Sequence, residues 1–161
     1  MRKTIFSFIA ILSILFISCK KDKPEEITAD IYLVAYEGSK LEGKVFGCND
    51  ILVPVPKTIK VEKNNVAAVL DELLQTKDSG ELKNFVKGPG LILYQVTISN
   101  GVADVYLKGD FMINVPCDIQ RIREQLYETA KQFPDVKKVK FFINDQTLES
   151  YLKIAAKGFK L

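Results

Sequence analysis

The chain has 161 residues, of which 23 are Lys or Arg and 20 are Asp or Glu, and its formal net charge is +3. This near balance provides no basic stripe of the kind that nucleic-acid binding requires, so no nucleic-acid partner is expected. Histidine is absent, which excludes Ser-His-Asp and Cys-His catalysis and every zinc site that needs imidazole.

The start of the chain has the composition of an export signal that ends at a cysteine. Arg2 and Lys3 supply positive charge, residues 5–17 are mostly apolar, and the small Ser18 precedes Cys19. This order predicts a signal peptide over residues 1–18. The residues ending at Cys19 resemble the bacterial lipobox, which implies that Cys19 is acylated and becomes the first mature residue. The alternative is an N-terminal membrane helix, but an apolar run of about 13 residues is shorter than the roughly 20 that span a bilayer.

Acylation of Cys19 would leave two of the three cysteines, Cys48 and Cys117. In an oxidising envelope compartment these two are free to pair, and both lie beside turn-forming residues. A disulfide between them would close a long loop and contribute about 4 kcal/mol in the chain-entropy model. The alternative is two buried free thiols.

Residues 19–29 are mostly polar and charged, and we expect a flexible tether there, followed by one domain over 30–161. The order Lys20-Lys21-Asp22 is similar to the charged export signals of surface lipoproteins in Bacteroidota. The domain is expected to begin with a strand over 31–36. These residues are apolar at both odd and even positions, which is typical of a strand that is covered on both faces.

Residues 51–61 are expected to be extended, and Pro54 and Pro56 place the first half of this segment at a sheet edge, because proline has no N–H to donate. Asn64 or Asn65 can cap a helix over 66–75, whose apolar residues share one face.

The strongest local signal is Asn100-Gly101 between two alternating runs over 91–107, which predicts a β-hairpin with a two-residue loop. Pairing Ser99 with Val102 then assigns one face to the core. This face carries Ile92, Tyr94, Val96, Ile98, Ala103, Val105 and Leu107. The apolar members of the opposite face form a candidate partner surface, unless residues 146–161 cover it. They are Leu93, Val102 and Tyr106.

Asp118 can cap a second amphipathic helix that ends before Pro134, and residues 138–143 alternate as a last strand. Residues 146–161 have weak helical or extended character. The expected fold class is therefore α/β (α+β), a single two-layer domain with a mixed β-sheet and two amphipathic helices packed on one face.

Three blocks of the sequence resemble the GerMN domain, of the sporulation and spore germination type. The first is a helix that ends in the pair Leu73-Leu74, and the second is the hairpin strand 101–107, which begins Gly-Val-Ala. The third is the Gln-Phe-Pro turn at 132–134 with the basic, apolar strand that follows it. Two departures concern loops: the usual Gly-Pro is displaced to Gly88-Pro89, and Asp145 stands where glycine is common.

The resemblance implies an envelope-associated module with no catalytic residues and no cofactor. We therefore expect a lipid-anchored protein of the cell envelope, at the outer membrane, whose domain binds or scaffolds an envelope protein. The alternative is a lipoprotein that binds a small ligand or a cell-wall glycan through tyrosine side chains, although tyrosines at core-facing strand positions usually belong to the core. Its candidates are Tyr32, Tyr36, Tyr94 and Tyr106.

Two groups of acidic residues invite a chemical interpretation. Asp104 and Asp110 could form an acid–base pair, although solvated charges explain them more simply. Asp118 could join Asn49 and Asp50 in a calcium site, although its role as a helix cap already explains it.

A small basic cluster consists of Lys137, Lys138 and Lys140. A solvated strand edge explains it, and contact with anionic lipid or a partner is the alternative.

Overall fold

The computed structural model describes residues 25–159. The predicted signal peptide, Cys19 and the first part of the predicted tether lie outside these residues. The strands of the described part are β1 (Glu25–Ala35), β2 (Lys44–Phe46), β3 (Asp50–Val61), β4 (Ile92–Ser99), β5 (Val102–Lys108), β6 (Lys138–Ile143) and β7 (Gln146–Thr147). Its helices are α1 (Asn65–Gln75), α2 (Pro116–Ala130) and α3 (Leu148–Gly158).

The first sheet is antiparallel, with the strand order β1-β3-β2. β1 pairs with β3 from Glu25 onward, so regular structure starts inside the segment expected to be a flexible tether. The reason is that β3 is long enough to offer these residues a partner up to Val61. β2 pairs only with residues 50–52 of β3. The predicted edge is therefore confirmed at Pro54 and Pro56, where β3 has a neighbour on one side, but not at residues 50–52.

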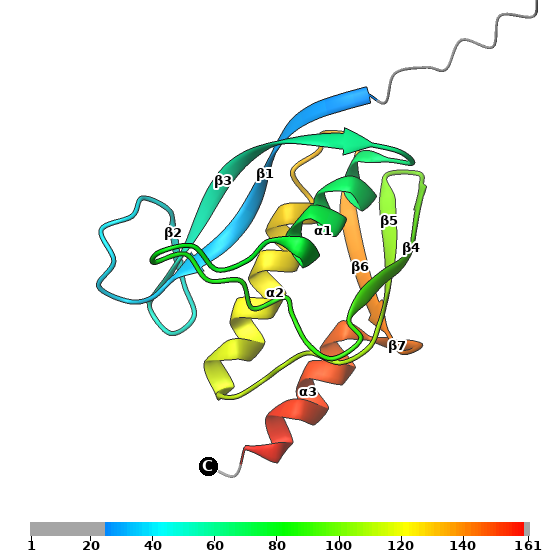
Figure 1. Cartoon of the computed structure of the whole chain (residues 1–161). Helices are drawn as coiled ribbons and strands as arrows, with labels where there is room; N and C mark the ends of the chain where they lie inside the picture. The colour runs from blue at the N-terminus through cyan, green and yellow to red at the C-terminus, as the bar shows by residue number, and fades with distance from the viewer. Residues whose placement is uncertain (1–24, 160–161) are drawn as a thin grey trace, which may run out of the picture.

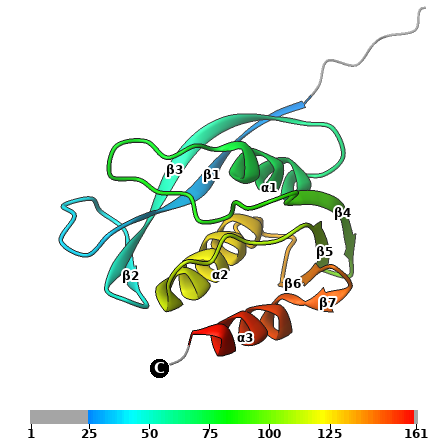
Figure 2. The same ribbon diagram turned by 60° about the horizontal axis from the view of Figure 1, so that its bottom comes forward.

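The second sheet has the order β4-β5-β6-β7 and is mixed, because β5 and β6 are parallel while its other pairs are antiparallel. The expectation of one sheet with two helices was therefore wrong, since the described residues form two sheets and three helices. Figures 1 and 2 show α1 and α2 between the sheets. α1 connects β3 to β4 along the chain and packs against both, which keeps these strands apart.

The core is a single cluster to which both sheets and all three helices contribute. The apolar stripes predicted for the two helices are confirmed as its centre, and their most deeply buried side chains are Val66, Val69, Leu70, Leu73, Ile122, Leu126 and Ala130. The predicted cap of α1 is also confirmed, because the Asn64 side-chain oxygen accepts a hydrogen bond from the Ala67 N–H at 2.8 Å.

The second helix begins earlier than expected. α2 starts at Pro116, a residue suited to the first helical position because it has no N–H to leave unpaired. Asp118 is therefore inside the first turn rather than at the cap. Its carboxylate reaches back and accepts hydrogen bonds from the N–H groups of Asn114 and Val115 at 2.9 and 3.1 Å.

The hairpin is confirmed at its turn. Ser99 pairs with Val102, and Asn100 and Gly101 both have positive φ, 51° and 76°, as a type I′ turn requires. A β-bulge at Tyr94 shifts the register further along, so that Leu93 pairs with Leu107. An extra residue in one strand exchanges the faces of the residues beyond it. Leu93 therefore points to the core side, whereas Ile92 and Tyr94, which were expected to face the core, are 53% and 58% exposed. Ile98, near the turn, was also assigned to the core face and is 38% exposed.

The last described helix, α3, lies on the inner side of the second sheet. Leu148 and Leu152 of α3 are buried in the common core, and Tyr151 packs edge-on against Phe111. Residues 146–159 therefore do not cover the outer face of β5 and β6. None of the helices in residues 25–159 combines the length and the apolar character needed to cross a bilayer.

Candidate functional site

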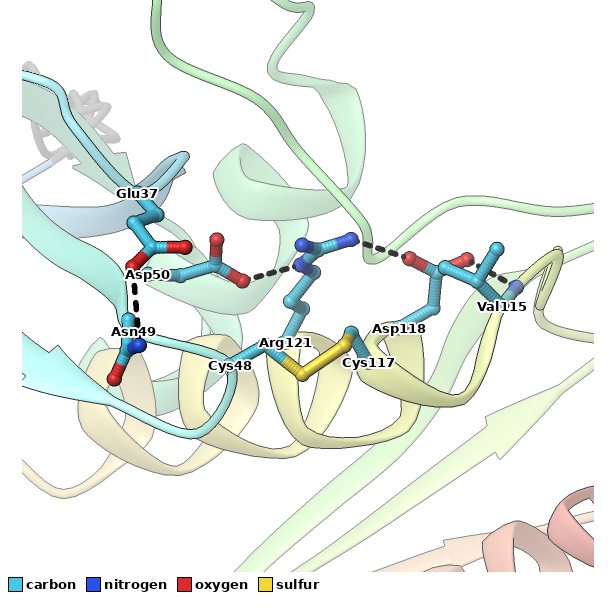
Figure 3. Close-up of a disulfide and its surroundings, with 8 residues drawn as sticks. All are labelled: Glu37, Cys48, Asn49, Asp50, Val115, Cys117, Asp118 and Arg121. Atoms are coloured by element: carbon cyan, nitrogen blue, oxygen red, sulfur yellow. Dashed lines mark hydrogen bonds and ion pairs between the residues drawn. A yellow bond between two sulfur atoms is a disulfide. The ribbon is translucent and has the colours of Figure 1, made fainter.

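A disulfide joins Cys48, just before β3, to Cys117 in the first turn of α2, as predicted (Figure 3). The two Cα atoms are 6.0 Å apart, within the range that a disulfide spans. This bond fixes the loop between β2 and β3 to the start of the helix that crosses the core.

A buried ion cluster lies beside the disulfide. The Arg121 Nε donates to an Asp50 oxygen at 2.6 Å, and its Nη1 donates to an Asp118 oxygen at 3.0 Å. Both carboxylates are only 2% exposed. Burial on its own lowers the pKa of the Arg121 guanidinium, but the hydrogen bonds to Asp50 and Asp118 outweigh it and raise that pKa.

The guanidinium also contacts two aromatic rings. It lies 4.8 Å from the ring centroid of Tyr36 and 4.8 Å from that of Phe85. Both carboxylates, both rings and the helix start are thus organised around one cation, Arg121. This cluster connects the start of β3 to the first turns of α2, and both of its carboxylates are paired with the guanidinium.

The calcium interpretation fails on this geometry, because Arg121 occupies the place between Asp50 and Asp118 that a cation would take. Asn49 instead donates to the Glu37 carboxylate at 3.1 Å. Within residues 25–159, no three or more His, Cys, Asp or Glu side chains are grouped so that they could hold a metal ion.

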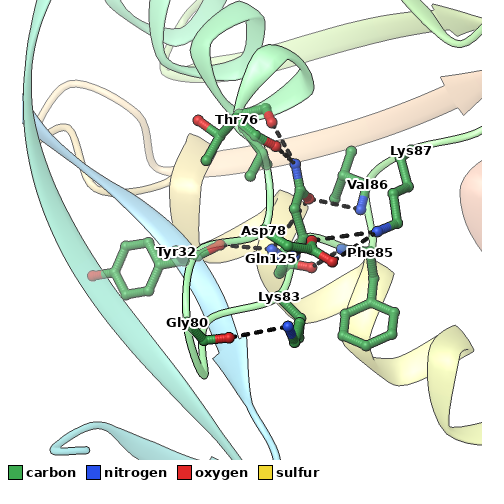
Figure 4. Close-up of polar contacts among 11 residues, drawn as sticks. Tyr32, Thr76, Asp78, Gly80, Lys83, Phe85, Val86, Lys87 and Gln125 are labelled. Atoms are coloured by element: carbon green, nitrogen blue, oxygen red, sulfur yellow. Dashed lines mark hydrogen bonds and ion pairs between the residues drawn. The ribbon is translucent and has the colours of Figure 1, made fainter.

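A second buried network connects α1, α2 and β1 through side-chain amides (Figure 4). The Asn84 amide donates to the carbonyls of Leu73 and Thr76 at 2.7 and 2.8 Å, which satisfies the end of α1. The Gln125 amide donates to the Tyr32 carbonyl at 2.9 Å and accepts from the Phe85 N–H at 2.8 Å. The sequence pattern did not predict this network, although Gln125 stands next to a core position of α2.

The outer face of the second sheet holds two of the three predicted partner residues. Val102 and Tyr106 are half-buried there, and the Tyr106 ring stacks on Phe142 of β6 with 4.9 Å between centroids. Leu93 is not with them, because the bulge turns it toward the core. The candidate surface is therefore Val102, Tyr106 and Phe142, which we call the outer-face patch.

Charged residues border this patch. Lys138 and Lys140 are exposed on β6 opposite Val102 and Asp104, and the Lys140 Nζ lies 3.5 Å from an Asp104 oxygen. The suggested acid–base pair is not formed, because Asp110 instead accepts a hydrogen bond from the Tyr151 hydroxyl at 3.1 Å. Lys137 differs from the other two lysines, since its side chain lies over Gly101 at the hairpin turn.

A groove of about 550 Å³ lies between α1, the end of β3 and β4. The α1 residues that line it include Ala67, Ala68 and Asp71, and the β4 residues are the consecutive positions 93–96. Partial burial is the main cause that raises the pKa of the Asp71 carboxyl, while Lys63 lowers it and Glu62 raises it.

The four tyrosines proposed to bind a glycan do not gather in one place. Tyr32 belongs to the first sheet and Tyr36 packs on Arg121, whereas Tyr106 stacks on the outer face of the second sheet. Tyr94 lines the groove, with the Lys108 ammonium 3.6 Å from its ring centroid.

The family model described as Germane: Sporulation and spore germination matches residues 31–149 of the chain. Among solved structures, the tandem GerMN domains of the sporulation protein GerM from Bacillus subtilis are similar, with a TM-score of 0.54 and 22% sequence identity. The match covers 76% of this chain and 40% of that one, so the chain spans less than half the length of that structure. No curated protein sequence matches the chain. At this identity the structural likeness shows the fold alone.

Proposed function

The chain belongs to the Germane family of sporulation and spore germination domains, and on that premise we propose that it is a lipid-anchored, non-catalytic binding module of the cell envelope. Members of the family are not known as catalysts. The chemistry of the buried charges supports the same conclusion, because Asp50 and Asp118 both serve to compensate Arg121.

The anchoring part of the proposal is supported by the sequence. Cys19 follows a charged start, a short apolar run and a small residue, and the order Lys20-Lys21-Asp22 comes directly after it. Each buried lipid CH₂ contributes about 0.8 kcal/mol, so several acyl chains hold a protein at a membrane stably where one does not. Confinement to a membrane also raises the effective concentration of neighbouring envelope proteins, which allows a modest interface to suffice.

The binding part is supported by one observation above all: among the described residues, none of the helices covers the outer face of the second sheet. This face carries the outer-face patch, in which Tyr106 and Phe142 stack on each other beside exposed lysines. Apolar and aromatic side chains on an open sheet face, rimmed by charge, are typical of a protein contact.

Anchoring is tested by fractionating cells that express Cys19→Ala. We expect this variant to leave the membrane fraction while its circular dichroism stays unchanged, because Cys19 makes none of the contacts found within residues 25–159. The matched control replaces Cys48 and Cys117 with serine and should stay in the membrane. Persistence of Cys19→Ala in membranes after a carbonate wash would count against the anchor.

Binding is tested by placing a photo-activated crosslinking residue at Val102 in cells. We expect a discrete crosslinked product with one envelope protein, whereas the same residue at the exposed Lys153 of α3 should give none. Equal crosslinking from both positions, or from neither, would refute the outer-face patch as the contact surface.

A further inference from the structure

The groove beside α1 runs along β4, the terminal strand of the second sheet. It touches positions 93–96 of β4, a span that contains the bulge at Tyr94. β4 stands at one end of the second sheet, with β5 on its other side. The backbone of β4 therefore borders the groove with an edge that no described strand occupies.

The opposite wall of the groove is also a strand edge, but that one is protected. Residues 58–60 of β3 line the groove, beyond the three positions that β2 covers. The part of β3 that β2 does not cover, residues 53–61, carries Pro54, Pro56, Lys57 and Lys60. Prolines and lysines are the usual means by which proteins keep a strand edge from pairing with another chain.

The β4 edge has no such protection over residues 95–99, whose sequence is Gln-Val-Thr-Ile-Ser. In an antiparallel ladder that starts at a two-residue loop, the groups of Ser99 point toward β5 and those of Ile98 point away from it. By the same alternation the N–H and C=O groups of Val96 also point outward. β4 thus offers donors and acceptors in register to an incoming strand.

The side chains that line the groove determine which side chains an incoming strand needs. Ala67 and Ala68 leave room for a medium-sized aliphatic side chain over α1. Glu72 is already paired with Lys57 at 3.0 Å. Asp71 takes part in none of the ion pairs found in residues 25–159, and it lines the same groove one position away. Lys60 and Lys63 also line the groove, and the charge of Lys63 acts on Asp71 without forming an ion pair with it.

We propose that the groove binds an extended segment of a partner protein, which adds as a strand to the open edge of β4 and places a lysine or arginine beside Asp71. The charge of Asp71 selects a basic residue, and the two alanines select an aliphatic residue two positions along the incoming strand. The proposal rests on the binding role proposed above but not on lipid anchoring or on the outer-face patch.

The test uses the full-length, detergent-solubilised protein and a fluorescent synthetic heptapeptide, Thr-Val-Thr-Lys-Thr-Val-Thr, in which valine stands two positions from the central lysine on either side. Fluorescence anisotropy should show saturable binding that is about tenfold tighter than for the same peptide with glutamate in place of lysine. N-methylation of the two backbone amides that face β4 should weaken binding about tenfold, because it removes donors without changing the side chains.

Protein variants locate the site. Asp71→Asn should reduce the preference for lysine over glutamate to about twofold, and Asp135→Asn, a matched change at an exposed carboxylate outside the groove, should leave it unchanged. The proposal is overturned if the N-methylated peptide binds equally well, if lysine and glutamate peptides bind alike, or if self-association of the protein, seen by sedimentation, competes with the peptide for the edge. Crosslinking from Val102 reports separately on the outer-face patch, so failure of one does not imply failure of the other.

Discussion

The two ends of this domain are stabilised in different ways. Where β3 and α2 begin, a disulfide, a buried arginine and two carboxylates fasten the chain, and we call this the fastened end. The second sheet contains no disulfide among the described residues. Its hairpin turn and the stacking of Tyr106 on Phe142 order it, and the edge of β4 and the outer face of the sheet remain uncovered. The contrast shows that covalent and ionic contacts close one region, whereas the second sheet, which shares the common core, keeps an uncovered edge and face that we propose as contact surfaces. Variants should therefore separate stability from binding.

The largest effect is expected from Arg121→Leu at the fastened end. Removing the guanidinium leaves Asp50 and Asp118 buried without a cation, which should lower the free energy of unfolding by about 3–5 kcal/mol. Urea denaturation measures this loss. Arg123→Leu is the matched control, because Arg123 is exposed and its pair with Glu124 should contribute less than about 1 kcal/mol. A loss below about 1 kcal/mol for Arg121→Leu would contradict the role of this cluster.

Replacing both Cys48 and Cys117 with serine should cost about 3 kcal/mol. The figure is lower than the chain-entropy value because Arg121 still connects the same two segments through Asp50 and Asp118. For the same reason the combined variant with Arg121→Leu should lose more than the sum of the separate losses. Simple additivity in denaturation experiments would show that the disulfide and the cluster act independently.

The dependence of stability on pH tests the ion pairs that Glu128 of α2 forms with Lys44 of β2 and with Lys131. Burial works to raise the pKa of Glu128, but hydrogen bonds from Lys131 and Lys44 outweigh it and lower that pKa. A lowered carboxyl pKa stabilises the fold above its unfolded value of about 4.3, and the contribution is lost as pH falls through the folded pKa. Glu128→Gln should therefore flatten the fall in stability below about pH 4.3, by at most about 1 kcal/mol because Lys44 is largely exposed. Glu42→Gln, an exposed control, should leave the pH profile unchanged.

The smallest effect is a gain in the second sheet. The turn between β6 and β7 consists of Asn144 and Asp145, with φ of 46° and 64°. Glycine adopts such angles without the clash that a Cβ causes, so Asp145→Gly should stabilise by about 0.5 kcal/mol in thermal unfolding. The hairpin turn supplies the converse, since Gly101→Ala at φ 76° should destabilise by about 1 kcal/mol. A stability change of the opposite sign in either variant would show that turn strain is not what limits this sheet.

The sequence predicted local features well. Asn100-Gly101 fixed the hairpin turn, Asn64 capped α1, and the alternation over 138–143 gave the buried face of β6. These features depend on neighbours along the chain, which is why the pattern contains them. Pairing Cys48 with Cys117 required only a count of cysteines and an assumption about the compartment.

Features that depend on distant contacts were not predicted. The bulge at Tyr94 lets Leu93 reach the core, which a strict alternation of residues excludes. Arg121 and Gln125 belong to the polar side of α2 by spacing, yet β3 and the segment around Phe85 cover them. The division into two sheets and the groove between α1, β3 and β4 follow from the same long-range packing.

The central claim is that the second sheet carries the partner-binding surfaces of an envelope-bound module. Hydrogen–deuterium exchange, followed by mass spectrometry on isolated native membranes and on the purified protein, tests it directly. The account predicts that amides of residues 95–106 exchange more slowly in the membranes, while those around Cys48 and Arg121 exchange alike in both. Identical exchange over 95–106 in the two samples, or slower exchange confined to the fastened end, would contradict it.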